Sequence, residues 1–507
     1  MSFNLSVVLR ESARLNPDKT AIIAEDQKIT YAELDHASNI VAGNLVLSGI
    51  APGDAVGLQL PNIPEFAMVF YGILKAGAVA IPMNILNKAP EITYFLKDAG
   101  AKALITISDF AEEGVRGAEL AGVEKIFVLG EANKADLQIE IRCFDELLKP
   151  VEGRATYVQR DPGDTAVLLY TSGTTGQPKG VELTHFQLYM NARAHVQGFE
   201  MNSDTVIISV MPLFHTLGLS GILNSTLSEG GTVVLIKRFD VVKVYEAIQE
   251  HKATLIHGVP TMYHELLHHP RAKEFDTSSL KVCGSAGAAI ASELLDRIQN
   301  EFGVVVLEAY GLTESGPLAT MNRRGRSKPY SIGTPLWGVE VEIWDENLQR
   351  MPPDRENIGE FVIRGHNTMR GYLNKPQATE DAFLGGWLHT GDLGYQDEDG
   401  FFFIVDRKKE MIIRGGYNVY PREIEEVLYK HPAISEAAVI GIPNEKLGEE
   451  VKAFVTMKPG VSATPQELIE FVKSQVAAYK YPRVLEIIER LPKSATGKIL
   501  KKMLKTP

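Results

Sequence analysis

Apolar residues in the first part of the chain fall into short continuous runs that alternate with longer segments of helical periodicity. The run at 54–62 predicts a strand, and the segment 64–77, where apolar residues recur at helical spacing, predicts an amphipathic helix. Asn62 stands where a cap is expected, and Gly77 where the helix should end. Because a further apolar run follows at 78–84, this region predicts a strand–helix–strand unit.

Later apolar runs each lead into a turn of small residues. They lie at 166–170, 252–260, 280–288 and 304–315, with helical patterns between them. Repeated alternation of strands and helices favours parallel sheets that are covered by helices. Ligands of such sheets bind at the carboxyl ends of the strands, so these turns are expected to carry the site.

The pattern changes near Pro335, where shorter strand-like pieces begin. These pieces predict an antiparallel barrel or a small sheet. After the segment "DRKKE" (406–410), helix and strand patterns form a compact α+β unit. The expected fold class is α/β. Its large N-terminal domain, 1–405, holds two βαβ-type subdomains plus a distorted β-barrel, and a small C-terminal domain of α+β type spans 406–507.

The composition is that of an ordinary globular protein, with 45% hydrophobic and 23% charged residues in a chain of 507. A net charge of −12 gives no general attraction to nucleic acid, so an anionic ligand would need a local cluster of donors and cations. Two cysteines, Cys143 and Cys283, cannot build a disulfide framework, which favours a cytoplasmic location. The N-terminus lacks a signal-peptide pattern, and no apolar stretch of about 18 residues predicts an integral membrane segment.

The apolar run at 166–170 leads into "TSGTTG", a segment of hydroxyl-bearing residues and glycines. Hydroxyls, free backbone N–H groups and glycines that allow close approach suit a phosphate-binding loop. Lys179 follows, but Gly180 stands where the common nucleotide-binding loop carries Ser or Thr. Taken alone, the segment is also compatible with a polar turn that binds nothing.

Three further segments carry candidate chemistry. In "EAYGLTES", Thr313 can donate to a phosphate oxygen and Glu314 offers an oxygen ligand for Mg²⁺. Asp392 can accept hydrogen bonds from sugar hydroxyls, and Arg407 can donate to them. Lys498 follows a glycine on an expected turn, from which its amine could reach a reacting phosphate. Each segment by itself is also compatible with a solvated turn or tail.

Taken together, the segments "YTSGTTGQPKG", "YGLTES", "TGD", "DRKKEMIIRGGYNVYP" and "GKI" resemble the adenylate-forming superfamily of acyl-CoA synthetases, luciferases and peptide-synthetase adenylation domains. They occur in the order and spacing of that superfamily and cover essentially the whole chain. The resemblance implies that a carboxylate attacks the α-phosphate of ATP and that a thiol then takes the acyl group. It also implies Mg²⁺, coenzyme A as co-substrate, and a C-terminal domain that rotates between the two half-reactions.

The resemblance further implies a role for each motif residue. Residues expected to bind ATP and AMP are Thr171, Ser172, Gly173, Thr174, Thr175, Lys179, Ser285, Gly287, Ala288, Glu308, Ala309, Tyr310, Thr313, Asp392, Arg407 and Lys498. The expected catalytic residues are Lys498, His215, Thr313 and Glu314, with Glu314 also holding Mg²⁺. Coenzyme A is expected at Arg238, Gly415 and Gly416, and the acyl group in a pocket of Leu217, Gly221, Val259 and Ala309. Lys409 is expected at the hinge, although an exposed lysine without a special role is the alternative.

Three features narrow the choice among the members of this superfamily. No carrier-domain pattern follows Lys498, so the acceptor is expected to arrive separately. His215 stands where amino-acid-activating relatives usually carry a motif with Asp, which holds the substrate ammonium, so a His there favours a plain carboxylate as substrate. Arg238 matches a position where relatives present a basic side chain to the coenzyme A nucleotide, although a surface salt bridge is an equal interpretation.

The expected acyl pocket is small or apolar, so it would admit an alkyl chain or an aromatic ring. The segments "GVPTMYHELLHHP" and "DRKKEMII" resemble bacterial medium- or long-chain fatty acyl-CoA synthetases, so a fatty acid is the expected substrate. A 4-coumarate-type aryl-CoA ligase is the first alternative and a luciferase-like oxygenase the second. A non-catalytic nucleotide binder is disfavoured because Lys498 and Glu314 are present. The partners expected are small molecules and not nucleic acid, and a homodimer is left open.

Overall fold

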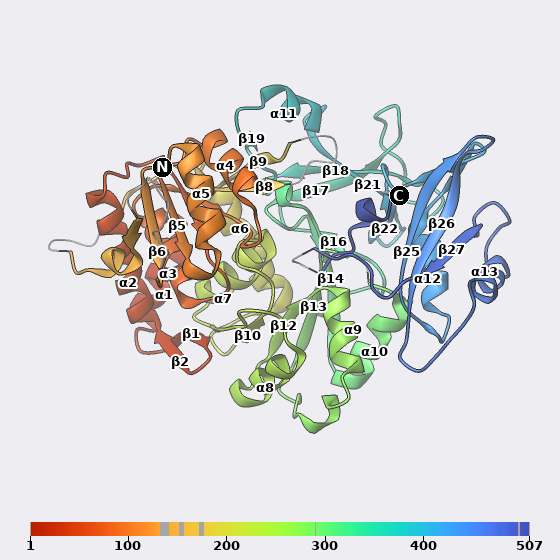
Figure 1. The fold of residues 1–507 in the computed structure, drawn as a ribbon, viewed down its shortest axis with the longest axis horizontal. Coiled ribbons are helices and arrows are strands. Elements are labelled where there is room, and N and C mark those ends of the chain that lie inside the picture. Colours follow the sequence, from red (N-terminus) through yellow and green to blue (C-terminus); the bar gives the residue numbers. More distant parts are fainter. Residues whose placement is uncertain are drawn as a thin grey trace.

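The computed structural model describes residues 2–131, 141–151, 157–171, 177–288, 290–494 and 497–505. It confirms the α/β fold class. Two large mixed sheets with their helices make up most of the chain, and two smaller, mainly antiparallel sheets follow (Figure 1). The chain runs from the N-terminal helices at the left of Figure 1 to the C-terminal sheet at the right.

The first large sheet has eight strands in the order β19–β9–β8–β4–β3–β5–β6–β7. Their bounds are β3 (Ala55–Gln59), β4 (Val79–Pro82), β5 (Ala103–Ile107), β6 (Lys125–Leu129), β7 (Ile141–Cys143), β8 (Thr165–Thr171), β9 (Lys179–Thr184) and β19 (Gly371–Tyr372). The helices of this region are α2 (Tyr31–Leu47), α3 (Pro64–Lys75), α4 (Ala89–Asp98) and α5 (Ala111–Ala121). The predicted strand–helix–strand unit is β3–α3–β4, and its two strands pair in parallel.

Asn62 does not cap α3, because the N-cap position is Ile63, which makes no side-chain cap. The side-chain amide of Asn62 instead donates to the carbonyl of Met211 at 3.0 Å, and its oxygen accepts from the N–H of Leu213 at 2.9 Å. The prediction of a cap is therefore wrong. A polar side chain next to a helix can bind any nearby backbone group, and here that group belongs to the loop after a strand of the other large sheet.

The second large sheet has nine strands in the order β16–β15–β14–β13–β12–β10–β11–β1–β2. Their bounds are β1 (Thr20–Ala24), β2 (Gln27–Thr30), β10 (Val206–Ser209), β11 (Thr232–Leu235), β12 (Leu255–Gly258), β13 (Val282–Ser285), β14 (Val305–Tyr310), β15 (Thr320–Met321) and β16 (Thr334–Pro335). The helices are α1 (Val7–Leu15), α6 (His185–Phe199), α7 (Ser225–Ser228), α8 (Val241–His251), α9 (Pro260–His268) and α10 (Ser292–Phe302). Strands β10 to β14 pair in parallel, so their carboxyl ends share one edge of the sheet.

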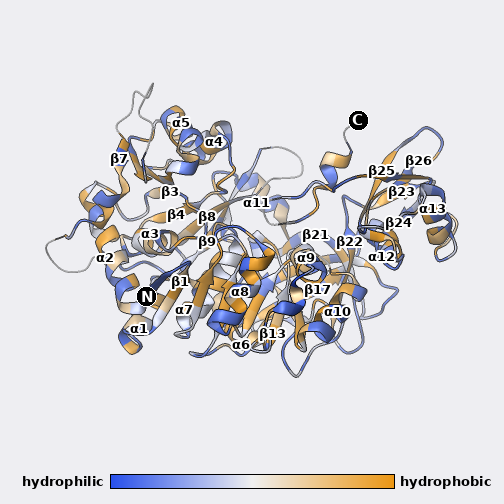
Figure 2. Ribbon diagram, turned by 60° about the horizontal axis from the view of Figure 1, so that its bottom comes forward, coloured by the Kyte–Doolittle hydropathy of each residue, from blue (hydrophilic) through white to orange (hydrophobic). Residues whose placement is uncertain are grey.

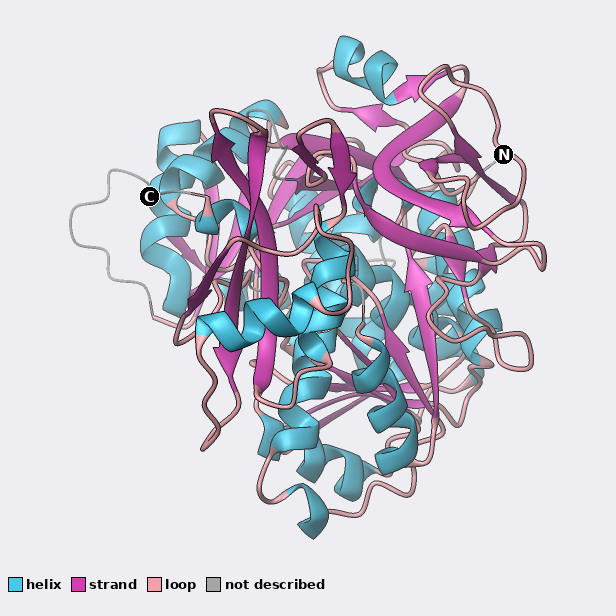
Figure 3. Cartoon of the chain, turned by 90° about the vertical axis from the view of Figure 1, so that its right-hand side faces the viewer, coloured by secondary structure: helices cyan, strands magenta, loops and turns pink. Residues whose placement is uncertain are grey.

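Two smaller sheets complete the fold. The first pairs β17 (Val339–Trp344), β18 (Gly359–Gly365), β20 (Phe383–Leu384), β21 (Trp387–Gln396) and β22 (Phe402–Arg407) in antiparallel fashion, with α11 (Pro376–Ala382) beside it. The second contains β23 (Ile412–Arg414), β24 (Tyr417–Val419), β25 (Ile434–Asn444), β26 (Gly448–Met457) and β27 (Val484–Ile487), with α12 (Pro421–Tyr429) and α13 (Pro465–Lys473). Viewed from the C-terminal side, this second sheet and its helices lie in front of the rest (Figure 3).

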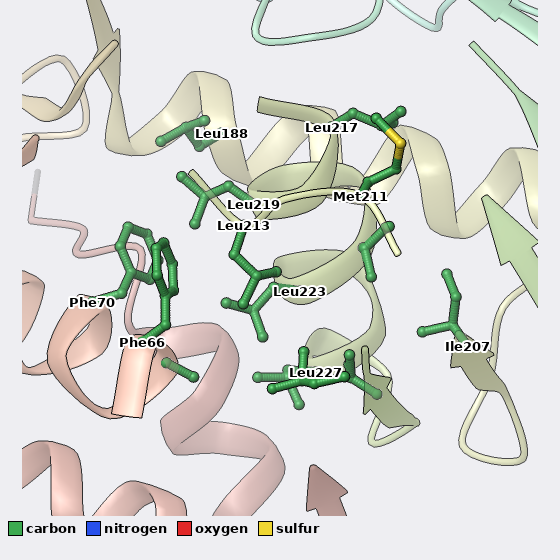
Figure 4. Close-up of a cluster of buried hydrophobic side chains, with 14 of the residues drawn as sticks. Phe66, Phe70, Leu188, Ile207, Met211, Leu213, Leu217, Leu219, Leu223 and Leu227 are labelled. Atoms are coloured by element: carbon green, nitrogen blue, oxygen red, sulfur yellow. The ribbon is translucent and has the colours of Figure 1, made fainter. Parts of the chain in front are cut away.

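The core of the large domain lies around a π-helix, η3 (Leu217–Asn224), that follows β10. In Figure 4, Leu219 and Leu223 of this helix lie close to Phe66 and Phe70 of α3. All four side chains are fully buried in one hydrophobic cluster, so packing holds the two large sheets together.

Many helices carry both orange, hydrophobic and blue, hydrophilic stretches (Figure 2), as expected of amphipathic helices that cover a sheet. None of the helices in the described parts of the chain has the length and apolar character that crossing a bilayer requires.

Candidate active site

A cavity of about 250 Å³ opens where the carboxyl ends of β13 and β14 face the C-terminal sheet. The predicted residues that line it are Ser285, Gly287, Ala288, Glu308, Ala309, Tyr310, Asp392, Arg407 and Lys498. They come from two strands of the second large sheet, from β21 and β22, and from the segment before the C-terminus. The fold therefore brings five separate segments of the sequence to one place.

Asp392 lies at the centre of the polar wall of this cavity. Strands β21 and β22 pair Asp392 with Arg407, and the Arg407 Nε atom lies 2.9 Å from Asp392 Oδ1. The second carboxylate oxygen accepts a hydrogen bond of 2.7 Å from the hydroxyl of Tyr310. A cation and a hydroxyl therefore hold the two oxygens of this buried carboxylate, which borders the cavity as a hydrogen-bond acceptor.

Glu308, at the carboxyl end of β14, is a second buried carboxyl group in the cavity wall. Burial raises its pKa to about 8; the charge of Arg422 opposes this shift and that of Glu426 adds to it. One oxygen, Oε1, has no hydrogen-bond partner among the described residues. At neutral pH this side chain is therefore mostly a neutral acid, which can donate one hydrogen bond and accept others.

Lys498 reaches the cavity from a turn that is fixed at both sides. Within the turn, the Ser494 N–H donates to the carbonyl of Lys498 at 2.8 Å, and the Lys498 N–H donates to the Ser494 hydroxyl at 3.2 Å. Across the domains, the Thr261 hydroxyl at the start of α9 donates to the carbonyl of Gly497 at 3.1 Å. Burial lowers the pKa of the Lys498 ammonium to about 8, and the charge of Arg407 lowers it further.

Gly497 allows this turn to approach the large domain closely. Its φ of +80° lies in the left-handed region. A Cβ atom at this position would lie 2.8 Å from the Thr261 hydroxyl and 3.0 Å from a methyl group of Val259. Glycine is therefore suited to this position for two reasons: it adopts the left-handed conformation, and it leaves room for the contact that holds the Lys498 turn against the large domain.

His215 lies on the loop that leads to η3, where the charge of Lys498 affects its pKa. Burial lowers the pKa of His215 to about 4, and the positive charge of Lys498 contributes to that shift. The Nδ1 atom of His215 accepts a hydrogen bond of 3.3 Å from the N–H of Leu217. His215 is therefore neutral at physiological pH and stands in the electrostatic field of the lysine that reaches the cavity.

Glu314 and Lys179 both contact the side chain of Tyr372. Strand β19 places Tyr372 next to β9, and the Tyr372 hydroxyl donates to Glu314 Oε1 at 2.9 Å. The Lys179 ammonium lies 4.6 Å from the centroid of the same ring. Thr171, the last residue of β8, pairs with Lys179 across the hairpin.

The remaining phosphate-loop residues, Ser172, Gly173, Thr174 and Thr175, lie outside the described residues. Thr313 opens the short turn that carries Glu314. Neither Thr313 nor Glu314 is among the residues that line the cavity.

The expected acyl-pocket residues are buried, except for the half-buried Ala309. Leu217 and Gly221 belong to the π-helix η3, and Val259 directly precedes α9. Val259 would contact a Cβ atom on Gly287 at 3.5 Å. Of these residues, only Ala309 lines the 250 Å³ cavity directly.

The residues expected to bind coenzyme A lie elsewhere. Arg238 lines a different cavity, of about 570 Å³, together with Lys237 and Lys243. Gly415 and Gly416 form the exposed turn between β23 and β24, with positive φ angles of 58° and 86°.

Lys409 is exposed between β22 and β23. Within the described parts of the chain, no group of three or more His, Cys, Asp or Glu side chains is arranged to hold a metal ion.

Sequence reasoning missed several charged residues of the cavity. Asp406, Glu410, Arg422 and Lys501 line it, and Lys501 lies 2.8 Å from Glu425 and 3.4 Å from Glu410. Asp406 and Glu410 could have been found, because they flank Arg407 in the same motif. Tyr372 gave no such signal, since only the pairing of β19 with β9 brings it to Glu314.

Comparisons with known proteins agree with this fold. Residues 9–373 match the AMP-binding enzyme family, and residues 423–498 match the AMP-binding enzyme C-terminal domain. The chain is 37% identical to a long-chain-fatty-acid–CoA ligase of Bacillus subtilis, over 99% of this chain and 94% of that one. It is 36% identical to a feruloyl-CoA synthase of an Amycolatopsis species, over 96% of both. An anthranilate CoA ligase crystallised with anthranoyl-AMP superimposes with a TM-score of 0.91 at 30% identity, over 99% of this chain and 96% of that one.

The fold is that of the adenylate-forming enzymes. The chain belongs to the AMP-binding enzyme family, the adenylate-forming superfamily that its motifs resemble. The predicted enzyme class, an AMP-forming acid–thiol ligase, is confirmed by relatives that are named CoA ligases and synthases.

Proposed function

We propose that this protein uses ATP to convert an organic carboxylic acid into an acyl-AMP, and then transfers the acyl group to the thiol of coenzyme A. The observation that carries this proposal is the cavity in which Asp392, Arg407 and Lys498 meet. Asp392 offers a hydrogen-bond acceptor to the ribose hydroxyls, and Arg407 offers a donor. Lys498 supplies a cation that borders both the large domain and the C-terminal segment.

The chemistry of the first step explains the need for this cation. A carboxylate oxygen of the acid bonds to the α-phosphorus of ATP, and the bond to the bridging oxygen of pyrophosphate breaks. Two anions must approach each other, so fixed positive charge and N–H donors lower the barrier. We assign this role to Lys498, with Thr313 as a donor to the α-phosphate and the neutral His215 beside the entering acid.

The β- and γ-phosphates are assigned to the hairpin of β8 and β9. Thr171 and Lys179 lie at the loop end of this hairpin, and Ser172, Gly173, Thr174 and Thr175 belong to the sequence that connects them. Glu314 is the residue that would hold Mg²⁺, because this ion takes one or two protein carboxylates together with phosphate oxygens and water. Bound there, the ion would neutralise phosphate charge.

The second step requires a different face of the C-terminal domain. We propose the domain boundary at 405/406 and the hinge at Lys409, which is exposed between strands of two different sheets. Gly415 and Gly416 lie on an exposed turn outside the cavity in the present arrangement. Rotation about the hinge would withdraw Lys498 and bring this turn to the acyl-AMP, while Arg238 holds the coenzyme A nucleotide.

A fatty acid remains the first substrate candidate, because the acyl-pocket residues Leu217, Gly221 and Val259 are apolar or small and the chain is similar to a long-chain-fatty-acid–CoA ligase. An aryl acid is the second candidate. It is favoured by similarity to a feruloyl-CoA synthase and to an anthranilate CoA ligase.

A panel of carboxylic acids tests the proposed function. Purified protein with ATP and Mg²⁺ should release pyrophosphate only when a suitable acid is present, and adding coenzyme A should convert the acyl-AMP into a thioester and AMP. Medium- and long-chain fatty acids should be compared with cinnamates and benzoates by their kcat/KM values. If no acid in a broad panel yields an acyl-AMP, the proposal is wrong.

The lowered pKa of Lys498 predicts the pH dependence of adenylation. The rate at low substrate concentration should fall as the pH rises through about 8, because the lysine then loses the charge that the reaction needs. The variant Lys498→Arg, whose guanidinium stays charged, should move this decline to higher pH even if its overall rate is lower. Initial pyrophosphate release, measured from about pH 6 to about pH 10, would contradict the assignment if both proteins declined at the same pH.

A further inference from the structure

Two buried histidines face each other next to the expected acyl pocket. His195 lies on α6 and His257 on β12, with exposed fractions of 0% and 2%. Their ring centroids are 6.0 Å apart in an edge-to-face arrangement, and both rings also contact Phe199. The function described above assigns no role to either histidine.

Glycines make room for both imidazoles. A Cβ atom on Gly221, in the π-helix η3, would lie 2.4 Å from His195 Nε2. A Cβ atom on Gly284, in β13, would lie 2.1 Å from His257 Nδ1. Neither contact is possible in a folded protein, so the two polar rings depend on the absence of side chains at both positions.

Each of the two imidazoles has one nitrogen without a hydrogen-bond partner among the described residues. His195 Nδ1 lies 3.1 Å from the carbonyl of Asn191, so this nitrogen donates its proton there and leaves Nε2 as a bare acceptor. The Nε2 atoms of His195 and His257 have no hydrogen-bond partner among the described residues, and neither does the hydroxyl of Ser285. A buried polar group without a partner is destabilising, by about 1–3 kcal/mol in general, which calls for a partner that is not part of the chain.

The two rings are neutral. Burial lowers the pKa of His195 to about 4. Burial also lowers the pKa of His257, to about 3, and repulsion between the protonated forms of the two rings contributes to that shift. A second carboxylate on the substrate would therefore meet no positive charge on these two rings.

Strand pairing connects the histidines to the active-site cavity. His257 pairs with Gly284, and the next residue, Ser285, lines the cavity wall. On the other side, His195 Nε2 lies against Gly221, which is expected to border the acyl group. Ser285 therefore borders the cavity, and His195 Nε2 lies against a residue of the expected acyl pocket, so the unsatisfied groups adjoin the region where the tail of the acid is expected.

We propose that the acid activated by this enzyme carries a hydroxyl or amino group, which donates a hydrogen bond to His195 Nε2 and is also bound by His257. This inference rests on the proposed function and names its substrate class: a hydroxy- or amino-substituted monocarboxylic acid, in place of an unsubstituted fatty acid or a dicarboxylic acid. An unsubstituted alkyl tail would leave both nitrogens without a partner. A hydroxyl group satisfies them, because it can donate to one ring and accept from the other.

Matched pairs of acids test the inference on the unmodified enzyme. Each pair differs only by the donor group: 4-coumarate and cinnamate, 2-aminobenzoate and benzoate, ω-hydroxydecanoate and decanoate. In at least one pair, kcat/KM for acyl-AMP formation should favour the substituted acid by about tenfold or more. The aromatic and aliphatic pairs also decide which skeleton carries the donor. If every unsubstituted acid reacts as well as its partner, the inference is wrong although the proposed function stands, whereas no turnover with any acid contradicts both.

Variants of His195 separate recognition from packing. In His195→Leu the ratio of kcat/KM for the substituted acid to kcat/KM for the unsubstituted acid should fall close to one. His195→Gln retains an acceptor oxygen and should restore much of the preference. The ratio of two substrates on one protein is not altered by a lower amount of folded enzyme, so unchanged ratios in His195→Leu and His257→Leu would overturn the inference.

Discussion

Replacing Lys498 by alanine should reduce the rate of acyl-AMP formation by about 10³-fold, while the transfer of an acyl group from supplied acyl-AMP to coenzyme A stays within about threefold of the wild type. The lysine reaches the cavity from a turn that is seated against Thr261, and its charge is the mobile cation of the first step. Thioester formation is expected with this turn withdrawn. The two half-reactions should be measured separately, by pyrophosphate release and by thioester formation from acyl-AMP.

Lys502 provides a matched control for this experiment. It lies four residues from Lys498 on the same terminal segment, is exposed, and does not line the cavity. Lys502→Ala should therefore leave both half-reactions unchanged. An equal loss of both half-reactions in Lys498→Ala would remove the argument for domain rotation.

Replacing Asp392 by alanine should weaken ATP binding by about 100-fold, because the change removes the acceptor for the ribose and leaves two partners unpaired. The Arg407 guanidinium and the Tyr310 hydroxyl both lose the carboxylate that holds them. Calorimetric titration with a non-hydrolysable ATP analogue measures the effect without turnover. Thermal unfolding of the same preparation checks that the variant is folded.

Tyr310→Phe serves as the comparison for Asp392→Ala. It removes one hydrogen bond to the carboxylate but leaves the contact between Asp392 and Arg407 in place. The affinity for the ATP analogue should fall by about tenfold or less. If Asp392→Ala binds the analogue as tightly as the wild type, the carboxylate does not contact the nucleotide.

The sequence was sufficient to predict the fold class and the position of the cavity. Apolar runs marked the strands β13 and β14, and each led into the turn that now lines the cavity. Local patterns of this kind are read directly along the chain, because a buried strand and the turn that ends it are adjacent in sequence. Resemblance to a known superfamily then suggested that Asp392, Arg407 and Lys498 would meet.

Contacts between distant segments could not be predicted in the same way. Asn62 has the right chemistry for a helix cap, yet it binds the backbone of another sheet. Tyr372 reaches Glu314 only through the pairing of a two-residue strand. The histidine pair depends on two glycines that are far apart in the sequence, so its unsatisfied nitrogens became visible only with the packing.

Val259 lies between the turn that carries Lys498 and the wall of the cavity. One of its methyl groups lies against the position of Gly497, and the other faces Gly287 in the cavity wall. An acid too bulky for its space would push this valine outward and, with it, unseat the turn that delivers the ammonium group. Selection by size would then be enforced through turnover as well as through affinity, since a poorly fitting acid prevents the catalytic arrangement from assembling around it.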